Sequence, residues 1–149
     1  MKLTNIIPPV YLFLSIAIML LLHFLLPLKK VLFFPLNLLG LILIALGIII
    51  NLVADRSFKK HKTTVKPFEV SRAFITTGIF RVSRHPMYLG FVLIIFGIAE
   101  LMGSLTPFIV VFVFAIFMDI VFIRFEEKKL EDTFGKAWHE YKKNVRRWI

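Results

Sequence analysis

The sequence predicts an all-α membrane protein: a polytopic helical bundle of about four spans with a cytoplasmic loop and C-terminal amphipathic helices. Its 149 residues are 58% hydrophobic with a mean hydropathy of +0.83, well above the roughly 45–50% apolar content of soluble domains. The apolar residues fall into four runs, each near the ~20 residues that a helix needs to cross a bilayer. These runs lack the alternation of barrel strands, so helices satisfy the backbone in lipid. We therefore expect one membrane domain over residues 1–149.

The predicted spans cover residues 9–28, 31–54, 87–102 and 105–123. No small-residue cleavage site follows the first run, which we interpret as a retained span and not a signal peptide. Lys29-Lys30 joins the first two spans and Gly103-Ser104 joins the last two. Both joints predict tight turns between antiparallel helices. Pro86 suits the first turn of the third helix, because the N–H that proline lacks is not needed there.

Basic residues lie mainly in two segments, the loop 55–86 and the tail 124–149. Two spans separate these segments, so we expect both on the same side of the membrane, with only Lys29 and Lys30 opposite. The positive-inside rule then predicts that the loop, the tail and both termini are cytoplasmic. The rule also explains the net charge of +10. Aromatic and basic residues are segregated along the chain, which argues against nucleic-acid binding.

The tail predicts two amphipathic helices that meet at Gly135. Residues 125–134 have helical spacing, and a glycine is typical of a helix C-terminus. The fourth span is expected to run on into the first of these helices. We expect the second, 136–143, to turn three residues toward the membrane interface: Ala137, Trp138 and Tyr141.

Residues 77–90, around the start of the third span, contain the densest group of polar side chains. Two arginines, a histidine and a tyrosine occur there: Arg81, Arg84, His85 and Tyr88. The free amides at this helix start could meet an anion such as a carboxylate. Gly90 leaves room for a ligand or a neighbouring helix to approach closely. Each residue alone has an ordinary explanation as an inside-positive charge, a helix-capping neighbour or an interfacial aromatic, but their grouping favours a site.

Glu126 and Glu127 form a second group, on the predicted extension of the fourth span. Paired acids at a membrane mouth can bind a cation or ribose hydroxyls. The alternative is a solvated charged helix with glutamate–lysine pairs along it. The expected position of these acids, facing the first group, argues for a site.

Taken together, the two groups resemble the C-terminal half of the isoprenylcysteine carboxyl methyltransferase and phospholipid methyltransferase superfamily. The resemblance covers roughly residues 55–149. It rests on an ordered set of residues: Gly78-Ile79-Phe80-Arg81, Arg84-His85-Pro86-Met87-Tyr88-Leu89-Gly90, Glu126-Glu127, Leu130, Phe134-Gly135, Tyr141 and Val145-Arg146-Arg147. It implies a membrane methyltransferase that uses S-adenosylmethionine and releases S-adenosylhomocysteine. The cofactor region would comprise residues 72–90 and 119–147.

The resemblance also implies roles for individual residues. The residues implied to bind the cofactor are Gly78, Arg81, His85, Tyr88, Gly90, Glu126 and Glu127. Those implied to be catalytic are Arg84, His85 and Glu127. Both arginines are candidates for the cofactor carboxylate or an anionic group of the acceptor. The acceptor would be a membrane-embedded amphiphile, such as a lipid amine or an isoprenylcysteine-like carboxylate, that enters from the lipid while the cofactor enters from the cytoplasm.

Methyl transfer from a sulfonium needs alignment and a dry site and no metal. The sequence has no cysteine, and His61 and His139 lack metal-ligand spacing, so we predict no metal site. Two alternatives stay open. One is a non-catalytic membrane protein of the same fold that binds lipid or acts as a scaffold. The other is a nicotinamide-dependent reductase related to sterol reductases.

Three ionisable residues lie within the apolar runs. Asp119 is deep in the fourth span, where an acid is a functional candidate or else a partner of Asn51 or an arginine. Glu100 is expected to reach the outer interface. His23 is expected to be packed or hydrogen-bonded and not a ligand.

Overall fold

The computed structural model describes residues 7–26, 28–61 and 73–149, and the regular elements in these ranges are helices. Residues 62–72 of the predicted basic loop lie outside the described residues. In chain order the elements are α1 (Pro8–Leu25), η2 (Leu36–Leu38), α2 (Leu39–Lys60), η3 (Gly78–Arg81), α3 (Pro86–Met102), α4 (Leu105–Met118), η4 (Asp119–Ile123) and α5 (Arg124–Asn144). The predicted all-α bundle is confirmed.

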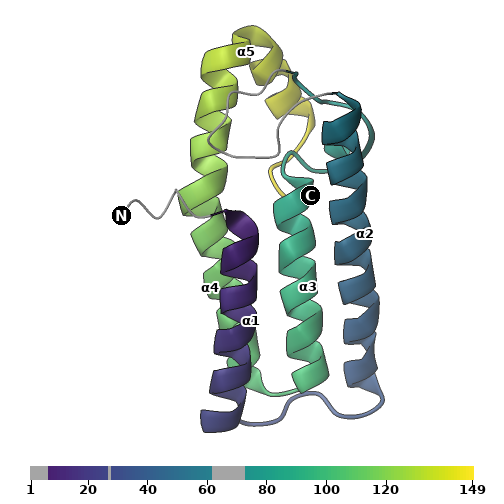
Figure 1. Cartoon of the computed structure of the whole chain (residues 1–149), viewed down its shortest axis with the longest axis vertical. Helices are drawn as coiled ribbons and strands as arrows, with labels where there is room; N and C mark the ends of the chain where they lie inside the picture. The colour runs from purple at the N-terminus through teal and green to yellow at the C-terminus, as the bar shows by residue number, and fades with distance from the viewer. Residues whose placement is uncertain (1–6, 27, 62–72) are drawn as a thin grey trace.

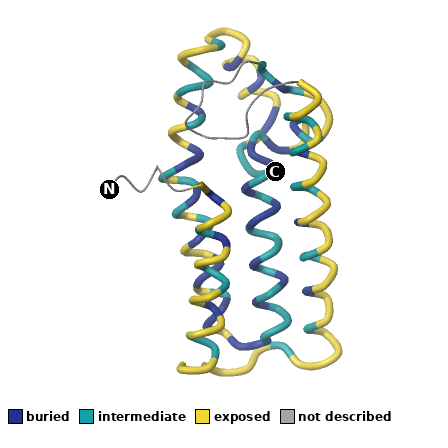
Figure 2. The backbone as a smooth tube through the Cα atoms, viewed as in Figure 1, coloured by how far each residue is buried: buried dark blue, intermediate teal, exposed yellow. Residues whose placement is uncertain are grey.

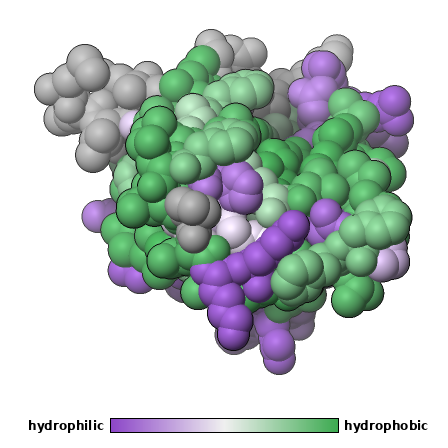
Figure 3. All heavy atoms as spheres, turned by 90° about the horizontal axis from the view of Figure 1, so that it is seen from below, coloured by the Kyte–Doolittle hydropathy of each residue, from purple (hydrophilic) through white to green (hydrophobic). Residues whose placement is uncertain are grey.

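Helix α3 lies at the centre of the bundle, with α2 on one side and α1 and α4 on the other (Figure 1). The connections from α1 to α2 and from α3 to α4 occupy one end of the bundle. The start of α3, the bend of α5 and the C-terminus lie at the other end. Figure 3 views the first end, which is largely hydrophobic and carries two exposed basic residues, Lys29 and Lys30.

Three helical stretches are long and apolar enough to cross a membrane, namely Pro8–Leu25, Leu36–Lys60 and Leu105–Asn144, and α3 is a shorter apolar helix of 17 residues. The apolar part of the third stretch ends at Ile123, where the charged residues of α5 begin. Much of α1 and α2 is exposed along its length (Figure 2). Such apolar surface requires a lipid environment. The chain is therefore a multi-pass membrane protein.

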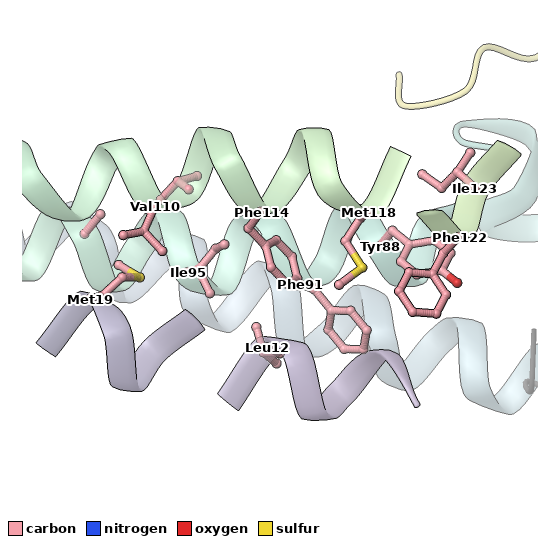
Figure 4. Close-up of a cluster of buried hydrophobic side chains, with 12 residues drawn as sticks. Leu12, Met19, Tyr88, Phe91, Ile95, Val110, Phe114, Met118, Phe122 and Ile123 are labelled. Atoms are coloured by element: carbon pink, nitrogen blue, oxygen red, sulfur yellow. The ribbon is translucent and has the colours of Figure 1, made fainter. Parts of the chain in front are cut away.

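The buried core lies between α1, α3 and α4 (Figure 4). Side chains from the three helices interlock there, including Met19 from α1, Ile95 from α3 and Phe114 from α4. Phe122 and Ile123 extend this core into η4. The core thus fixes the direction in which α4 continues beyond the apolar region.

Helices α2 and α3 pack through glycines instead of large side chains. A Cβ added to Gly47 would lie 2.5 Å from the backbone oxygen of Gly90, and Gly40 and Gly97 oppose each other in the same way. Small residues allow membrane helices to approach this closely. This contact fixes α2 against the helix that begins after His85 and carries Tyr88 in its first turn.

The second helix differs from its prediction. It was expected over 31–54, but its helical residues begin at Leu36 and end at Lys60. Pro35 explains the late start, because proline disfavours helix at the residue before it. The tight turn expected at Lys29-Lys30 is therefore wrong: the connection runs on to Pro35, and the N–H groups of Val31 and Leu32 donate to the Gly103 oxygen. The predicted turn at Gly103-Ser104 is confirmed.

Helix α5 bends at Gly135, as predicted, with φ 47° and ψ −114°. A side chain disfavours such a backbone conformation, so glycine suits the position. The expectation that Trp138 and Tyr141 face the membrane interface is wrong, because both are buried against Phe74 and Phe134. The Tyr141 hydroxyl donates to the Phe80 oxygen at 2.5 Å. The bend therefore folds the end of α5 back over η3.

At the opposite end of the bundle, the Nδ1 atom of His23 lies 2.7 Å from the Ser104 hydroxyl, which confirms the expected hydrogen bond. Glu100 lies near the end of α3, its Cβ is close to Gly40 of α2, and its Oε2 atom is buried.

Candidate functional site

The two polar groups singled out in the sequence meet at the end of the bundle formed by α5 and the start of α3. His85 occupies the N-cap position of α3, and Pro86 is the first residue of the helix. The chain of α4, η4 and α5 carries Glu126 and Glu127 alongside (Figure 1). The two ring nitrogens of His85 each lie 3.4 Å from one of these carboxylates. The predicted juxtaposition is confirmed.

Glu126 is held by two side chains from the start of α3. The Tyr88 hydroxyl donates to its Oε1 atom at 2.5 Å, and Nδ1 of His85 lies 3.4 Å from its Oε2 atom. Tyr88 and His85 are both buried. Both oxygens of Glu126 are therefore oriented by the first turn of α3.

Glu127 is buried, with 6% of its surface exposed, and is surrounded by positive groups. Arg147 donates to it twice, from Nη2 to Oε2 at 2.6 Å and from Nε to Oε1 at 3.2 Å. Nη2 of Arg84 lies 3.2 Å from Oε1, and Nε2 of His85 lies 3.4 Å from the same oxygen. A buried carboxylate needs such partners, since an unpaired buried charge is strongly destabilising.

This network favours the charged forms of His85 and Glu127. Burial alone would raise the pKa of Glu127, but pairing with His85 and Arg147 and the charge of Arg84 lower that pKa to about 2. Burial alone would lower the pKa of His85, but its pairing with Glu126 and Glu127 raises that pKa above the ordinary 6.5. The result is an imidazolium between two carboxylates.

Arg84 has hydrogen-bond donors that the network does not use. Its side chain is 8% exposed, and its guanidinium carbon lies 5.5 Å from the centre of the Trp138 ring. Among the described residues, Nε and Nη1 of Arg84 are buried without a hydrogen-bond partner. A guanidinium presents its N–H groups in a planar fork that suits carboxylates and phosphates. Arg84 is thus equipped to bind an anion while Glu127 holds its remaining nitrogen.

The other predicted site residues lie outside this network. A Cβ on Gly90 would meet the side chain of Asn51 at 2.7 Å, so the close approach it allows is that of the neighbouring helix α2. Gly78 begins η3 with φ +64°, and no atom lies within 4 Å of where its Cβ would be. Arg81 ends η3 and is exposed. The structure therefore joins five of the predicted residues in one network: Arg84, His85, Tyr88, Glu126 and Glu127.

Sequence reasoning missed the role of Arg147. Its Nη1 atom lies 3.0 Å from Oδ1 of Asp119, whose other oxygen lies 3.3 Å from Nε of Arg124. Of the partners considered for Asp119, the arginine is the one found. The rule that an acid within a span is functional or paired pointed to Asp119, but no spacing pointed to the C-terminal arginine that meets it.

A family model described as phospholipid methyltransferase matches residues 36–137, which run from η2 into α5 and include Arg84, His85, Tyr88 and both glutamates. The chain belongs to the phospholipid methyltransferase family. Arg147 lies beyond the part of the chain that the family model matches.

A curated relative of this family member is a methanethiol S-methyltransferase from Pseudomonas deceptionensis. It is 32% identical over 111 residues, which are 71% of this chain and 39% of the relative. The chain thus spans well under half of the relative's length. No solved structure matches the chain.

Proposed function

We propose that this protein is an integral membrane methyltransferase that moves a methyl group from S-adenosylmethionine to an amphiphilic acceptor in the membrane. Family membership and the lipid-exposed helices support this proposal. The observation that carries it is the buried network of Arg84, His85, Glu126 and Glu127, in which Arg84 keeps two unpartnered donors. Strongly perturbed, buried charges of this kind are typical of functional sites.

The side chains in this network fit the polar parts of the cofactor. The free N–H groups of Arg84 suit its carboxylate, and Glu126 suits its ammonium or ribose hydroxyls. When bound, S-adenosylmethionine supplies a methyl group on an electrophilic sulfonium. Glu127 contacts Arg84 and His85 and is itself held by Arg147, so that the groups that bind the cofactor are fixed before it arrives. Such preorganisation serves an in-line displacement, which depends mainly on alignment and exclusion of water.

The acceptor class follows from proton chemistry and from the membrane. A carboxylate or thiolate acceptor needs no base, whereas an amine acceptor must lose a proton. Glu126 suits this task better than His85, because pairing with the two glutamates raises the pKa of His85 and so favours its protonated form, which cannot accept a proton. A lipid amine or an isoprenylcysteine-like carboxylate would reach the site from the lipid side. The relative's name adds a small thiol as a third acceptor class.

Orientation in the membrane follows from charge. The end of the bundle with the candidate site carries most of the basic residues, whereas the connections at the other end carry Lys29 and Lys30. By the positive-inside rule the site and both termini would face the cytoplasm, where the cofactor is made.

The test is methyl transfer by the purified protein in lipid nanodiscs, using S-adenosylmethionine with an isotopically labelled methyl group. A lipid extract, a phospholipid with a primary amine, a prenylated cysteine and an alkyl thiol are offered separately, and products are identified by mass spectrometry. We expect labelled product from the wild type and none from Glu127→Gln. The proposal fails if the wild type, with lipid extract present, binds neither S-adenosylmethionine nor S-adenosylhomocysteine. Binding without labelled product from any acceptor would favour the scaffold alternative.

A further inference from the structure

Asp119 and Arg147 lie beside the network of Arg84, His85, Glu126 and Glu127. Arg147 contacts Glu127 in this network, and Asp119 contacts Arg147. We infer that Asp119 and Arg147 are positioning residues: the π-helical turn at η4 puts Asp119 on the same helix face as Glu127, and Arg147 bridges the two carboxylates. This inference rests on the proposed function, because Glu127 is the group that it says is positioned.

Arg147 binds the two acids with different parts of one guanidinium. Nη2 and Nε donate to Glu127 at 2.6 and 3.2 Å, and Nη1 donates to both oxygens of Asp119 at 3.0 and 3.3 Å. All three nitrogens of the fork are therefore engaged. An arginine held on both sides loses its freedom to rotate, so it fixes Glu127 in one orientation.

The π-turn explains why the two acids share a face. Glu127 follows Asp119 by eight residues, and the Arg124 N–H donates to the Asp119 oxygen, five residues back, as a π-turn requires. In an uninterrupted α-helix, eight residues would leave the two side chains about 80° apart around the axis. A π-turn holds about one residue more than an α-turn, which reduces this angle to about 20°. One arginine can then reach both acids.

The main chain fixes where Arg147 lies. The Ser83 hydroxyl donates to the Arg147 oxygen at 3.2 Å, and the Arg84 N–H donates to the Arg146 oxygen at 3.1 Å. The same Ser83 hydroxyl oxygen accepts from the N–H of His85 at 3.2 Å. The segment after α5 is thereby tied to the residues that precede α3, and the arginine approaches from a fixed direction.

Arg124 offers a matched control. It contacts Asp119 at 3.3 Å from the exposed side, with 63% of its side chain accessible. Among the described residues it makes no ion pair with Glu127. Removing Arg124 takes a positive charge from Asp119 but leaves the bridge intact. Removing Arg147 breaks the bridge.

The experiment has one readout without ligand and one with it. In detergent, the Glu127 carboxyl is titrated by NMR in protein labelled with carbon-13 glutamate and assigned by comparison with Glu127→Gln. The affinity for S-adenosylhomocysteine is measured by calorimetry on the same samples. The variants are Arg147→Gln, Arg147→Lys, Asp119→Asn, the Asp119→Asn and Arg147→Gln pair, and Arg124→Gln.

We expect the midpoint of the Glu127 titration to rise in Arg147→Gln and, by less, in Asp119→Asn. The groups left facing Glu127 are Arg84, His85 and the neighbouring Glu126. Arg147→Lys keeps the charge and should shift the midpoint less than Arg147→Gln. Affinity should fall about tenfold in Arg147→Gln, the scale of a lost charge-assisted hydrogen bond, and the double variant should be no weaker than Arg147→Gln. Arg124→Gln should match the wild type in both readouts.

A positioning role is overturned if Arg147→Gln and Asp119→Asn lower the unfolding temperature yet leave both the Glu127 titration and the affinity unchanged. In that case the bridge from Asp119 through Arg147 to Glu127 only holds the segment after α5 in place. If the wild type binds no S-adenosylhomocysteine, the proposed function fails, and the ligand-free titration still decides whether Arg147 and Asp119 position Glu127. Should Arg147→Gln fail to fold, Arg147→Lys and Asp119→Asn give the same comparison.

Discussion

The Tyr88 hydroxyl on α3 donates a 2.5 Å hydrogen bond to Oε1 of Glu126 on α5. Tyr88 also belongs to the buried core, where its ring lies 6.3 Å from that of Phe122 in η4. One side chain therefore connects the packing between α3 and η4 to the orientation of a candidate site residue. Substitutions at this position should separate the two effects.

Tyr88→Phe should weaken binding of S-adenosylhomocysteine about tenfold, because Glu126 loses a hydrogen bond to a charged group, worth about 1.5–3 kcal/mol. The ring stays in the core, so a fall in the unfolding temperature should reflect the lost hydrogen bond and not lost packing. Calorimetry and thermal unfolding in detergent measure the two quantities. Phe91→Leu is the control, since it changes the core nearby without touching Glu126. Equal affinity in Tyr88→Phe and the wild type would mean that this hydrogen bond does not serve binding.

Gly47→Leu should destabilise the protein by about 3 kcal/mol, the upper range for overpacked interiors. Even a Cβ at this position would lie 2.5 Å from the Gly90 oxygen, so α2 must move away from α3. The unfolding temperature in detergent measures the effect. Ala45→Leu on the same helix is the control, because Ala45 is exposed and the added side chain can face lipid. Similar unfolding temperatures for the two variants would contradict close packing at Gly47.

The pH dependence of stability should show two limbs. The lowered pKa of Glu127 means that its contribution is present above the ordinary pKa of 4.5 and is lost as the pH falls toward about 2. The raised pKa of His85 means that its contribution is present below 6.5 and is lost as the pH rises through its folded pKa. Both contributions are present together between about pH 4.5 and 6.5.

Unfolding temperatures of the wild type and two variants, measured from well below pH 4.5 to well above pH 6.5, check both limbs. The difference between wild type and Glu127→Gln should shrink toward low pH, and the difference for His85→Asn should shrink toward high pH. Glu131→Gln is the control, because 43% of the Glu131 side chain is exposed and, among the described residues, it pairs with His139. If these differences in unfolding temperature stay constant with pH, the network does not stabilise the charged forms of Glu127 and His85.

Gly135→Ala should destabilise the protein by about 1–3 kcal/mol, the cost of a backbone conformation that side chains disfavour. No atom crowds the position, so the cost is conformational and not steric. Because the bend brings Trp138 and Tyr141 over Phe74, near-ultraviolet circular dichroism should also change. Lys136→Ala, at the next, exposed position, should leave both signals unchanged. An unaltered spectrum in Gly135→Ala would mean that the bend does not need glycine.

The sequence was sufficient where a single physical rule dominates. Hydropathy located the apolar helices, and the antiparallel order of the last two spans placed residues 84–88 opposite Glu126 and Glu127. Prediction from the sequence failed where contacts between residues far apart in the chain determine the structure. The late start of α2 depends on Pro35 and on the backbone contacts with Gly103. The burial of Trp138 depends on Phe74, which lies in the segment before η3.

The bridge from Asp119 to Glu127 could not be read from spacing at all. On an ideal helix the two acids would lie about 80° apart around the axis, and the π-turn brings them to one face. Arg147 is separated from Asp119 by the whole of α5, beyond the reach of any local pattern.

Binding of S-adenosylhomocysteine to the wild type, Arg84→Gln and Arg124→Gln, measured by calorimetry in lipid nanodiscs, tests the central claim most directly. Arg84 is the buried arginine with unpartnered donors, and Arg124 is an exposed arginine at the same end of the bundle. We expect the wild type and Arg124→Gln to bind with equal affinity and Arg84→Gln, folded and monodisperse, to lose binding. Wild-type affinity in Arg84→Gln would contradict a cofactor site built on this network.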